Sequence, residues 1–210
     1  MQFDMRSLPL LARYKILNST ITPRPIAWVT TLSRDGVRNA APYSFFNAVG
    51  DDPPLLVLGL LKHPVTGLMK DTARNIVETG EYVVNLVCED DAERMVQCSV
   101  DAPADVDETL YAGVETADSV LVKPPRIASS PVSFECRKHS AIDIGRQTVV
   151  LGEILMTHIQ DRFVLDAAKQ YVDTPAMKLI GRTHGSGWYV RNSDAFKLER
   201  PAYDPSRGQG

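Results

Sequence analysis

Strand-like segments follow one another along this chain without the regular crossover helices that a parallel sheet requires. Residues 26–32, 55–60 and 81–87 are rich in apolar and β-branched side chains, 132–137 alternates apolar with polar residues, and 148–159 is long and strand-like. Antiparallel strands can be joined by short turns, whereas parallel strands need long crossovers. The sequence therefore predicts a mainly β fold with helical insertions, a closed or split barrel rather than a doubly wound sheet.

The segment 22–47 predicts a hairpin whose two arms differ in character. Its first arm, 26–32, is apolar and is followed by a turn at 33–36, but the return arm from Asn39 to Asn47 contains a proline, small residues and polar side chains in place of regular alternation. We expect the return arm to line a ligand-binding site. Polar residues on an exposed strand would be the commoner explanation of Ser44 and Asn47 taken alone.

Helices are expected in the connections between strands. Residues 71–79 have apolar side chains on one face and end before Gly80, a typical C-terminal glycine, with Asp71 or Thr72 as the N-cap. A second helix is expected near 89–98, and 101–113 reads as a loop with at most one helical turn. The strands 132–137 and 148–159 are expected to pair as a hairpin with a bend near Gly152.

The size and composition of the chain indicate one domain. With 210 residues, 44% of them hydrophobic, the chain can bury one substantial core. We predict a single domain over 1–210, with its core at about 15–191 and a flexible polar tail at 200–210.

Charge and residue patterns exclude several classes of protein. The net charge of −3 and the lack of clustered Lys and Arg argue against a nucleic-acid surface. The longest apolar run, Leu55–Leu61, is too short to span a membrane, and with no signal pattern we expect a cytoplasmic location. Three widely spaced cysteines predict neither disulfides nor a metal site, and no other metal-ligand spacing occurs.

A candidate anion site lies at the start of the 71–79 helix. The first backbone N–H groups of a helix lack partners within the helix, and Lys70 places a cation beside them. Thr72 can add a hydroxyl donor, so these residues suit a phosphate group. The alternative is an ordinary capped helix with a solvated lysine.

Several motifs recur in the order and spacing of a known family. The segments TPRPIAWVTT, NAAPYSFFNAV, DPPLLVLGL, KDTARNI and GEYVVNLV, followed by LVKPPRI, SPVSFEC, VVLGEI and GRTHGSGWY, resemble the flavin reductase-like, FMN-binding split-barrel family. The resemblance covers about residues 15–191. It implies a six-stranded, Greek-key-like split barrel with added helices, a homodimer, and FMN bound noncovalently near the subunit interface.

The resemblance also implies cofactor-binding residues in four segments of this chain. Residues near the isoalloxazine or the phosphate tail would be Arg24, Pro25, Ala27 and Trp28, and residues lining the flavin would be Ser44, Phe45, Phe46 and Asn47. The helix start would contribute Lys70, Asp71, Thr72 and Asn75 to the phosphate and ribityl end, and the C-terminal element would add Gly181, Arg182 and Tyr189. Trp28 can stack on a ring or fill the barrel core, and the core role is the one we favour.

The predicted function is the transfer of hydride from NAD(P)H to FMN by an NAD(P)H:flavin reductase. No Rossmann fingerprint is present, so the nicotinamide would dock transiently over the flavin. No catalytic residue is assigned, because the flavin carries the electrons, and His184 is the histidine with a possible role. The alternative is an FMN-retaining electron-transfer flavoprotein that is reduced by a protein partner and has no NAD(P)H reductase activity of its own. A third hypothesis is a barrel that has lost flavin and kept only the ability to dimerise. A partner oxygenase or another electron acceptor would receive the electrons.

Overall fold

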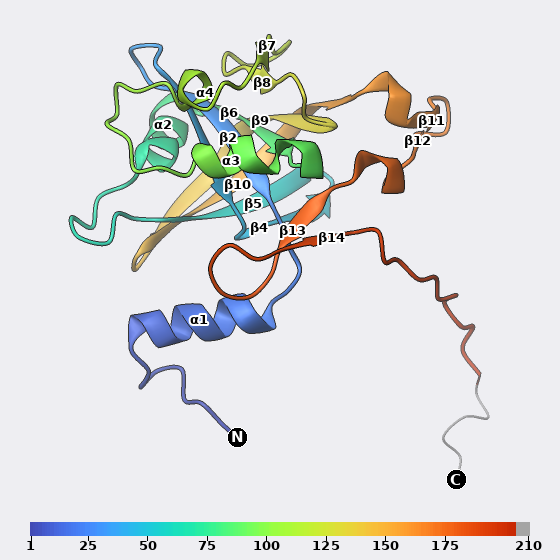
Figure 1. Cartoon of the computed structure of the whole chain (residues 1–210), viewed down its shortest axis with the longest axis horizontal. Coiled ribbons are helices and arrows are strands. Elements are labelled where there is room, and N and C mark those ends of the chain that lie inside the picture. The colour runs from blue at the N-terminus through green and yellow to red at the C-terminus, as the bar shows by residue number, and fades with distance from the viewer. Residues whose placement is uncertain (205–210) are drawn as a thin grey trace.

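A seven-stranded antiparallel sheet forms the centre of the computed structural model, which describes residues 1–204 (Figure 1). Neighbouring strands follow the order β3-β2-β6-β9-β10-β5-β4. The strands are β2 (Ala27–Leu32), β3 (Arg38–Tyr43), β4 (Phe46–Asp51), β5 (Pro54–Leu61), β6 (Glu81–Leu86), β9 (Val132–Ile144) and β10 (Gln147–Ile159).

The two edge strands of this sheet are consecutive in the chain. Only Ser44 and Phe45 separate β3 from β4, so a single bent segment supplies both edges and gives six strands when it is counted once. At the bend, the Gly59 N–H on β5 donates to the Phe45 carbonyl oxygen at 2.7 Å. A Cβ atom on Gly59 would lie 3.0 Å from the Cβ atom of Phe45, so glycine allows this close approach. The predicted mainly β split barrel is confirmed.

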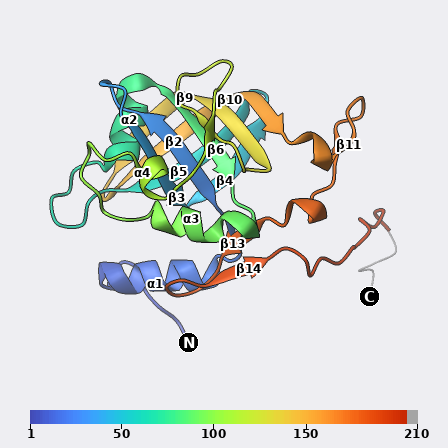
Figure 2. The ribbon, with the colours of Figure 1, turned by 45° about the horizontal axis from the view of Figure 1, so that its top comes forward.

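Helices and small sheets surround the barrel (Figure 2). A three-stranded sheet of order β1-β13-β14 lies beside α1, and two further two-stranded pairs occur. The helices are α1 (Leu10–Thr20), α2 (Asp71–Thr79), α3 (Ala92–Gln97) and α4 (Glu108–Tyr111), with 3₁₀ turns η1 (Glu89–Asp91), η2 (Asp161–Phe163) and η3 (Pro175–Met177). The short strands are β1 (Arg24–Pro25), β7 (Thr116–Ala117), β8 (Arg126–Ile127), β11 (Val164–Asp166), β12 (Tyr171–Val172), β13 (Ile180–Arg182) and β14 (Tyr189–Arg191).

Most predicted elements form, with two corrections. Helix α2 ends at Gly80 with φ of +80°, and the register of β10 against β9 shifts at Gly152, both as predicted. The N-cap of α2 is Lys70, and no side chain caps the helix, because Asp71 and Thr72 are already its first helical residues. The helix expected near 89–98 divides into η1 and α3.

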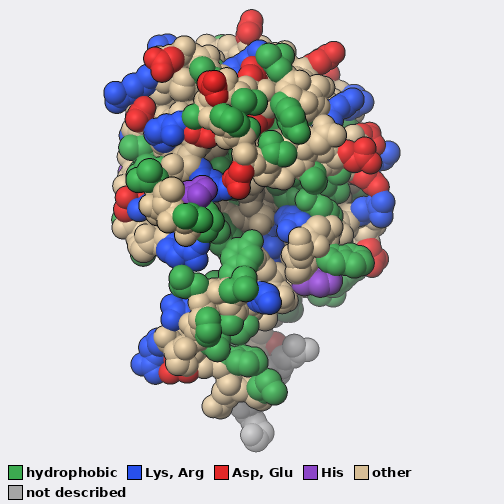
Figure 3. Space-filling model, turned by 60° about the vertical axis from the view of Figure 1, so that its left-hand side comes forward, with side chains coloured by type: hydrophobic (Ala, Val, Ile, Leu, Met, Phe, Trp, Pro, Cys, Tyr) green, Lys and Arg blue, Asp and Glu red, His purple; other side chains and the backbone are tan. Residues whose placement is uncertain are grey.

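Helix α1 was not expected from the sequence. Its apolar residues are spread around the helix and do not form one stripe, so the usual 3.6-residue periodicity is missing. Some of these apolar side chains are therefore exposed, and Figure 3 shows apolar side chains on the part of the surface formed by α1. They include Leu10, Leu11, Tyr14 and Leu17.

The hydrophobic core fills the barrel and extends under α3. One cluster includes Leu56, Leu58, Ile76 and Tyr82, and a second surrounds Trp28, all almost fully buried. The structure thus places Trp28 as a filler of the core.

Residues beyond β14 have no regular secondary structure as far as residue 204. Of the tail predicted at 200–210, residues 205–210 lie outside the described residues, and the single-domain assignment remains a prediction. Within residues 1–204, no helix is long and apolar enough to cross a membrane.

Candidate active site

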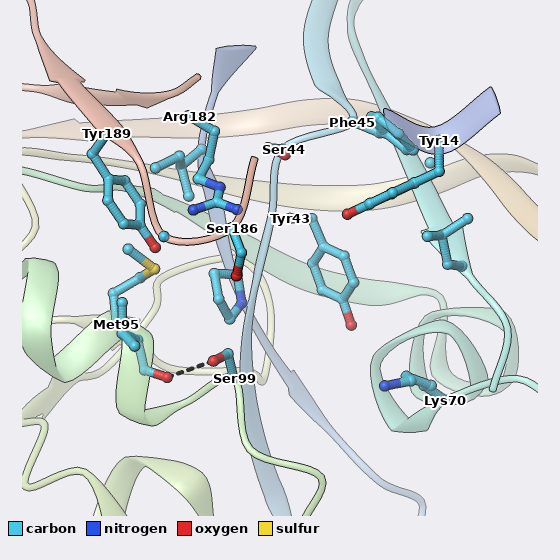
Figure 4. Close-up of a pocket in the computed structure, with 16 residues that line it drawn as sticks. Tyr14, Tyr43, Ser44, Phe45, Lys70, Met95, Ser99, Arg182, Ser186 and Tyr189 are labelled. Carbon is cyan, nitrogen blue, oxygen red and sulfur yellow. Dashed lines mark hydrogen bonds between the residues drawn. The ribbon is translucent and has the colours of Figure 1, made fainter. Parts of the chain in front are cut away.

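A pocket of about 440 Å³ opens where the barrel is split (Figure 4). The bend between β3 and β4 forms one wall, and α1, α3, the start of α2 and the β13–β14 hairpin complete it. Its lining residues are Tyr14, Ile26, Pro42, Tyr43, Ser44, Phe45, Gly59, Leu61, Lys70, Met95, Val96, Ser99, Arg182, Ser186, Gly187 and Tyr189.

The lining of this pocket is aromatic and carries positive charge. Among residues 1–204, Lys70 and Arg182 are its charged lining residues, and no carboxylate from this part of the chain lines it. Burial raises the pKa of Tyr43 to about 12, and its phenol, protonated at neutral pH like that of any ordinary tyrosine, can donate a hydrogen bond. Tyr14 meets Phe45 edge to face, with ring centroids 6.3 Å apart. These features suit a planar, anionic, aromatic ligand.

Lys70 joins the pocket to the N-terminus of α2. Its ammonium forms an ion pair with Asp101, with Nζ and Oδ1 2.7 Å apart. The lysine side chain is 38% exposed and the aspartate side chain 74%, so solvent screens the pair and it contributes little to stability. Since the first N–H groups of α2 also lack partners within the helix, an anionic ligand can replace Asp101 at little cost.

A second pocket of about 450 Å³ adjoins the first and shares Pro42, Tyr43, Lys70 and Ser99 with it. Beside it lies a buried polar network in which Asn39 Nδ2 donates to Thr72 Oγ1 at 2.8 Å. The network therefore fixes the side chain of Thr72, which lines this pocket.

Asn75 extends this network away from the pocket lining. Its Nδ2 donates to Thr31 Oγ1 at 3.0 Å, and Asn39 Nδ2 lies 3.3 Å from the same oxygen. Asn75 Oδ1 is buried without a hydrogen-bond partner in the described part of the chain. Because such an acceptor is costly to leave unpaired, a further donor is expected here.

Arg24 ties the walls of the first pocket together from behind. It is only 5% exposed and donates through Nη1 to the carbonyl oxygens of Asn18, at 2.7 Å, and Ile21, at 2.6 Å. Nη2 donates to the Thr183 carbonyl oxygen at 3.1 Å, and Nε lies 3.3 Å from Ser44 Oγ. One side chain thus holds the end of α1, the bend and the β13–β14 hairpin in place.

Replacing Arg24 with lysine is expected to loosen these walls. Lysine keeps the charge but has no planar fork with which to reach three segments, so the free energy of unfolding should fall by about 1–2 kcal/mol. We also expect faster proteolytic cleavage around 10–21, measured by limited trypsin digestion beside a thermal melt. Arg13→Lys is the matched control, because Arg13 donates to the carbonyl oxygens of Leu8 and Arg6 at the other end of α1. Equal cleavage of the two variants would contradict the role of Arg24.

The structure brings some of the sequence-predicted residues to the pockets and leaves others outside. Lining the first pocket are Ser44, Phe45, Lys70, Arg182 and Tyr189, and lining the second are Lys70, Asp71 and Thr72. Outside both linings are Arg24, Pro25, Ala27, Trp28, Phe46, Asn47, Asn75 and Gly181. Ala27 and Trp28 are fully buried in the core, and Asn47 points to solvent on β4.

Sequence reasoning missed several lining residues. Tyr14 lies on the unexpected helix α1, and Met95 belongs to the apolar face of α3, which gave no sign of facing a ligand. Tyr43 lies in the return arm 39–47, which was expected to line the site, although Tyr43 was not itself among the predicted residues. His184 does not line either pocket, since its ring stacks on Trp188 with centroids 5.7 Å apart.

Comparisons with known proteins assign the family. A model described as "Flavin reductase like domain" matches residues 19–175. An uncharacterized protein of Deinococcus radiodurans is 40% identical over 205 residues, which is 96% of this chain and 90% of that protein.

Two solved structures are similar over almost their whole length. The Pseudomonas fluorescens 2-nitrobenzoate 2-nitroreductase NbaA has 36% identity and a TM-score of 0.89, covering 99% of this chain and 100% of that one. Nitrilotriacetate monooxygenase component B from Bacillus cereus has 27% identity and a TM-score of 0.88, covering 94% and 98%. The family match and the split barrel agree, and the chain belongs to the flavin reductase-like family of flavoproteins.

Proposed function

We propose that this protein is an FMN-binding oxidoreductase that transfers hydride from NAD(P)H to FMN, as an NAD(P)H:flavin reductase. The observation that carries the proposal is the first pocket, in which aromatic walls, two cations and a helix N-terminus meet without a carboxylate of the described residues in the lining. When bound, FMN would supply the electron-transfer chemistry, taking a hydride and passing electrons onward.

The residues of the pocket fit such a cofactor. Lys70 and the first N–H groups of α2 would bind the phosphate, because a cation and a helix N-terminus both favour a dianion. Tyr43, whose phenol is protonated at neutral pH, can donate to a polar edge of the flavin ring. The hydroxyl of Ser44 accepts from Arg24 and keeps its own hydrogen for donation. Tyr14 and Phe45 would exclude water from one side of the site.

The finer assignments are also part of the proposal. We propose a cytoplasmic location and a homodimer. The exposed apolar side chains of α1 support the homodimer, because they are of the kind that a second copy would cover. A similar protein is named as a component of a nitrilotriacetate monooxygenase, which supports a partner oxygenase as one acceptor of the electrons. An FMN-retaining electron carrier reduced by a protein partner remains the alternative function.

The visible absorption spectrum of the purified protein tests this proposal. We expect flavin bands after loading with FMN, and their bleaching when NADH or NADPH is added without oxygen. NAD(P)H oxidation no faster than with free FMN, for both nicotinamides, would rule out the reductase. FMN retained through gel filtration with no bleaching would favour the electron carrier.

A further inference from the structure

The guanidinium of Arg182 lies in the pocket without an acidic partner in the described part of the chain. It sits over the Tyr189 ring, 4.8 Å from the centroid, and its one hydrogen bond within residues 1–204 is a long 3.5 Å contact to the Gly185 carbonyl oxygen. Figure 4 shows its side chain directed into the pocket between Tyr189 and Ser44. An arginine with five donors that is held this loosely has room for a ligand.

Neighbouring cations are already occupied. Arg24 donates to three main-chain carbonyl oxygens and to Ser44, Lys70 is paired with Asp101, and Arg191 on the same hairpin is paired with Glu89. Arg182 differs from them because most of its five donors have no hydrogen-bond partner within residues 1–204.

The surroundings of Arg182 also favour a negative charge. Arg182 is the register partner of Arg24 across β1 and β13, so two guanidinium groups belong to adjacent strands. Burial and the charge of Arg182 lower the pKa of Arg24, and no carboxylate of the described residues lines the pocket to offset the two charges. An anionic ligand would relieve this repulsion.

The walls beside Arg182 indicate the rest of the ligand. Tyr189 and Met95 lie next to each other on one side of Arg182, and Ser186 adds a hydroxyl to the lining (Figure 4). A guanidinium binds a carboxylate with two parallel hydrogen bonds, and an aromatic ring packs well against side chains such as Tyr189 and Met95. Lys70 approaches from the opposite end of the pocket, where the proposed FMN phosphate would lie.

We propose that Arg182 binds the carboxylate of a small, planar aromatic acid, the second ligand of the FMN site. This inference rests on the proposed function, because it assigns the flavin phosphate to Lys70 and leaves Arg182 for the other ligand. It makes Arg182 a residue that selects anionic over neutral aromatic molecules.

Benzoate and benzamide, which share their shape but differ in charge, test the inference. Each is titrated into the FMN-loaded protein, and binding is followed by calorimetry and by the change in flavin absorbance. We expect benzoate to bind at least about tenfold more tightly than benzamide, because only benzoate can form a charge-assisted pair with Arg182. Arg182→Gln should bind the two equally, and Arg182→Lys should keep part of the preference because it keeps the charge.

The control variant is Arg191→Gln, which removes an arginine of the same hairpin that is paired with Glu89 and lies outside the pocket lining. It should keep the preference for benzoate. A wild-type protein without that preference, or an Arg182→Gln variant that retains it, would overturn the inference.

A further arm separates Arg182 from the flavin. FMN and riboflavin are titrated into the flavin-free protein. The FMN affinity of Arg182→Gln should stay within about threefold of that of the wild type, because Arg182 makes no direct contact with the flavin in this assignment. A loss of FMN but not riboflavin affinity in Arg182→Gln would place the flavin phosphate at Arg182 and overturn the inference. If the wild type binds no FMN at all, the proposed function fails, and the benzoate titration of the flavin-free protein still decides whether Arg182 selects anions.

Discussion

Replacing Gly152 with alanine is expected to lower the free energy of unfolding by about 3 kcal/mol. A Cβ atom at this position would lie 1.7 Å from the hydroxyl oxygen of Tyr82 and 2.7 Å from its ring carbon Cζ. Tyr82 is fully buried among core side chains, so moving its ring away from the new methyl group would disturb their packing. For a protein of this size, the melting temperature should fall by roughly 6–12 °C in a thermal melt followed by circular dichroism.

Two further variants separate this contact from a general effect of alanine. Gly50→Ala on β4 is the matched control, because its added Cβ would meet only the Pro53 carbonyl oxygen at an ordinary 3.6 Å. Adding Tyr82→Phe to Gly152→Ala removes the nearer clashing atom, which is also a buried hydroxyl without a partner in the described residues. That double variant should recover part of the lost stability. Equal melting of Gly152→Ala and Gly50→Ala would show that β10 does not approach Tyr82 in this way.

Replacing Lys70 with glutamine is expected to weaken FMN binding by about 10–100-fold, because a charge-assisted contact to the phosphate is lost. Riboflavin has no phosphate, so its affinity should change by less than about threefold. Fluorescence titration of both flavins measures the difference. Lys62→Gln is the control, since Lys62 pairs with Asp143 and lines neither pocket.

The ion pair between Lys70 and Asp101 allows a second test of the same phosphate site. Asp101→Asn removes the carboxylate that competes with the phosphate for Lys70. FMN should then bind about 2–5-fold more tightly, a small gain because solvent screens the ion pair that is lost. Asp105→Asn removes the same charge from the same loop outside both pocket linings, and should have no such effect. Unchanged FMN affinity in Lys70→Gln would move the phosphate away from α2.

The sequence predicted the elements whose signals are local. Helix α2 has its apolar face and Gly80, and the return arm 39–47 lacks alternation at the place where the barrel is split. Helix α1 could not be predicted, because its apolar residues do not share one face and it is held by Arg24 and by the contact of Tyr14 with Phe45. Such contacts between distant segments leave no periodic pattern.

The site residues likewise divide into those with a local sequence signal, which could be predicted, and those placed by contacts between distant segments, which could not. Ser44, Phe45 and Lys70 stand at local breaks in the pattern, and the structure brings them to one pocket. Arg24 was expected near the flavin, but its hydrogen bonds to Asn18 and Thr183 show that it holds the walls from behind. That position depends on segments nearly 160 residues apart in the sequence, so no short motif could reveal it.

The bent segment that supplies both edges of the sheet also bears on self-association through strand edges. Exposed edge strands that are long and flat can recruit strands from other molecules and seed aggregates. Here β3 and β4 have an ordinary six residues each, but β3 contains Pro42, and the register of β4 against β5 shifts between Ala48 and Gly50. A proline and a bulge are among the means by which natural sheets prevent such growth. The split that opens the pocket therefore leaves no long straight edge for β-aggregation.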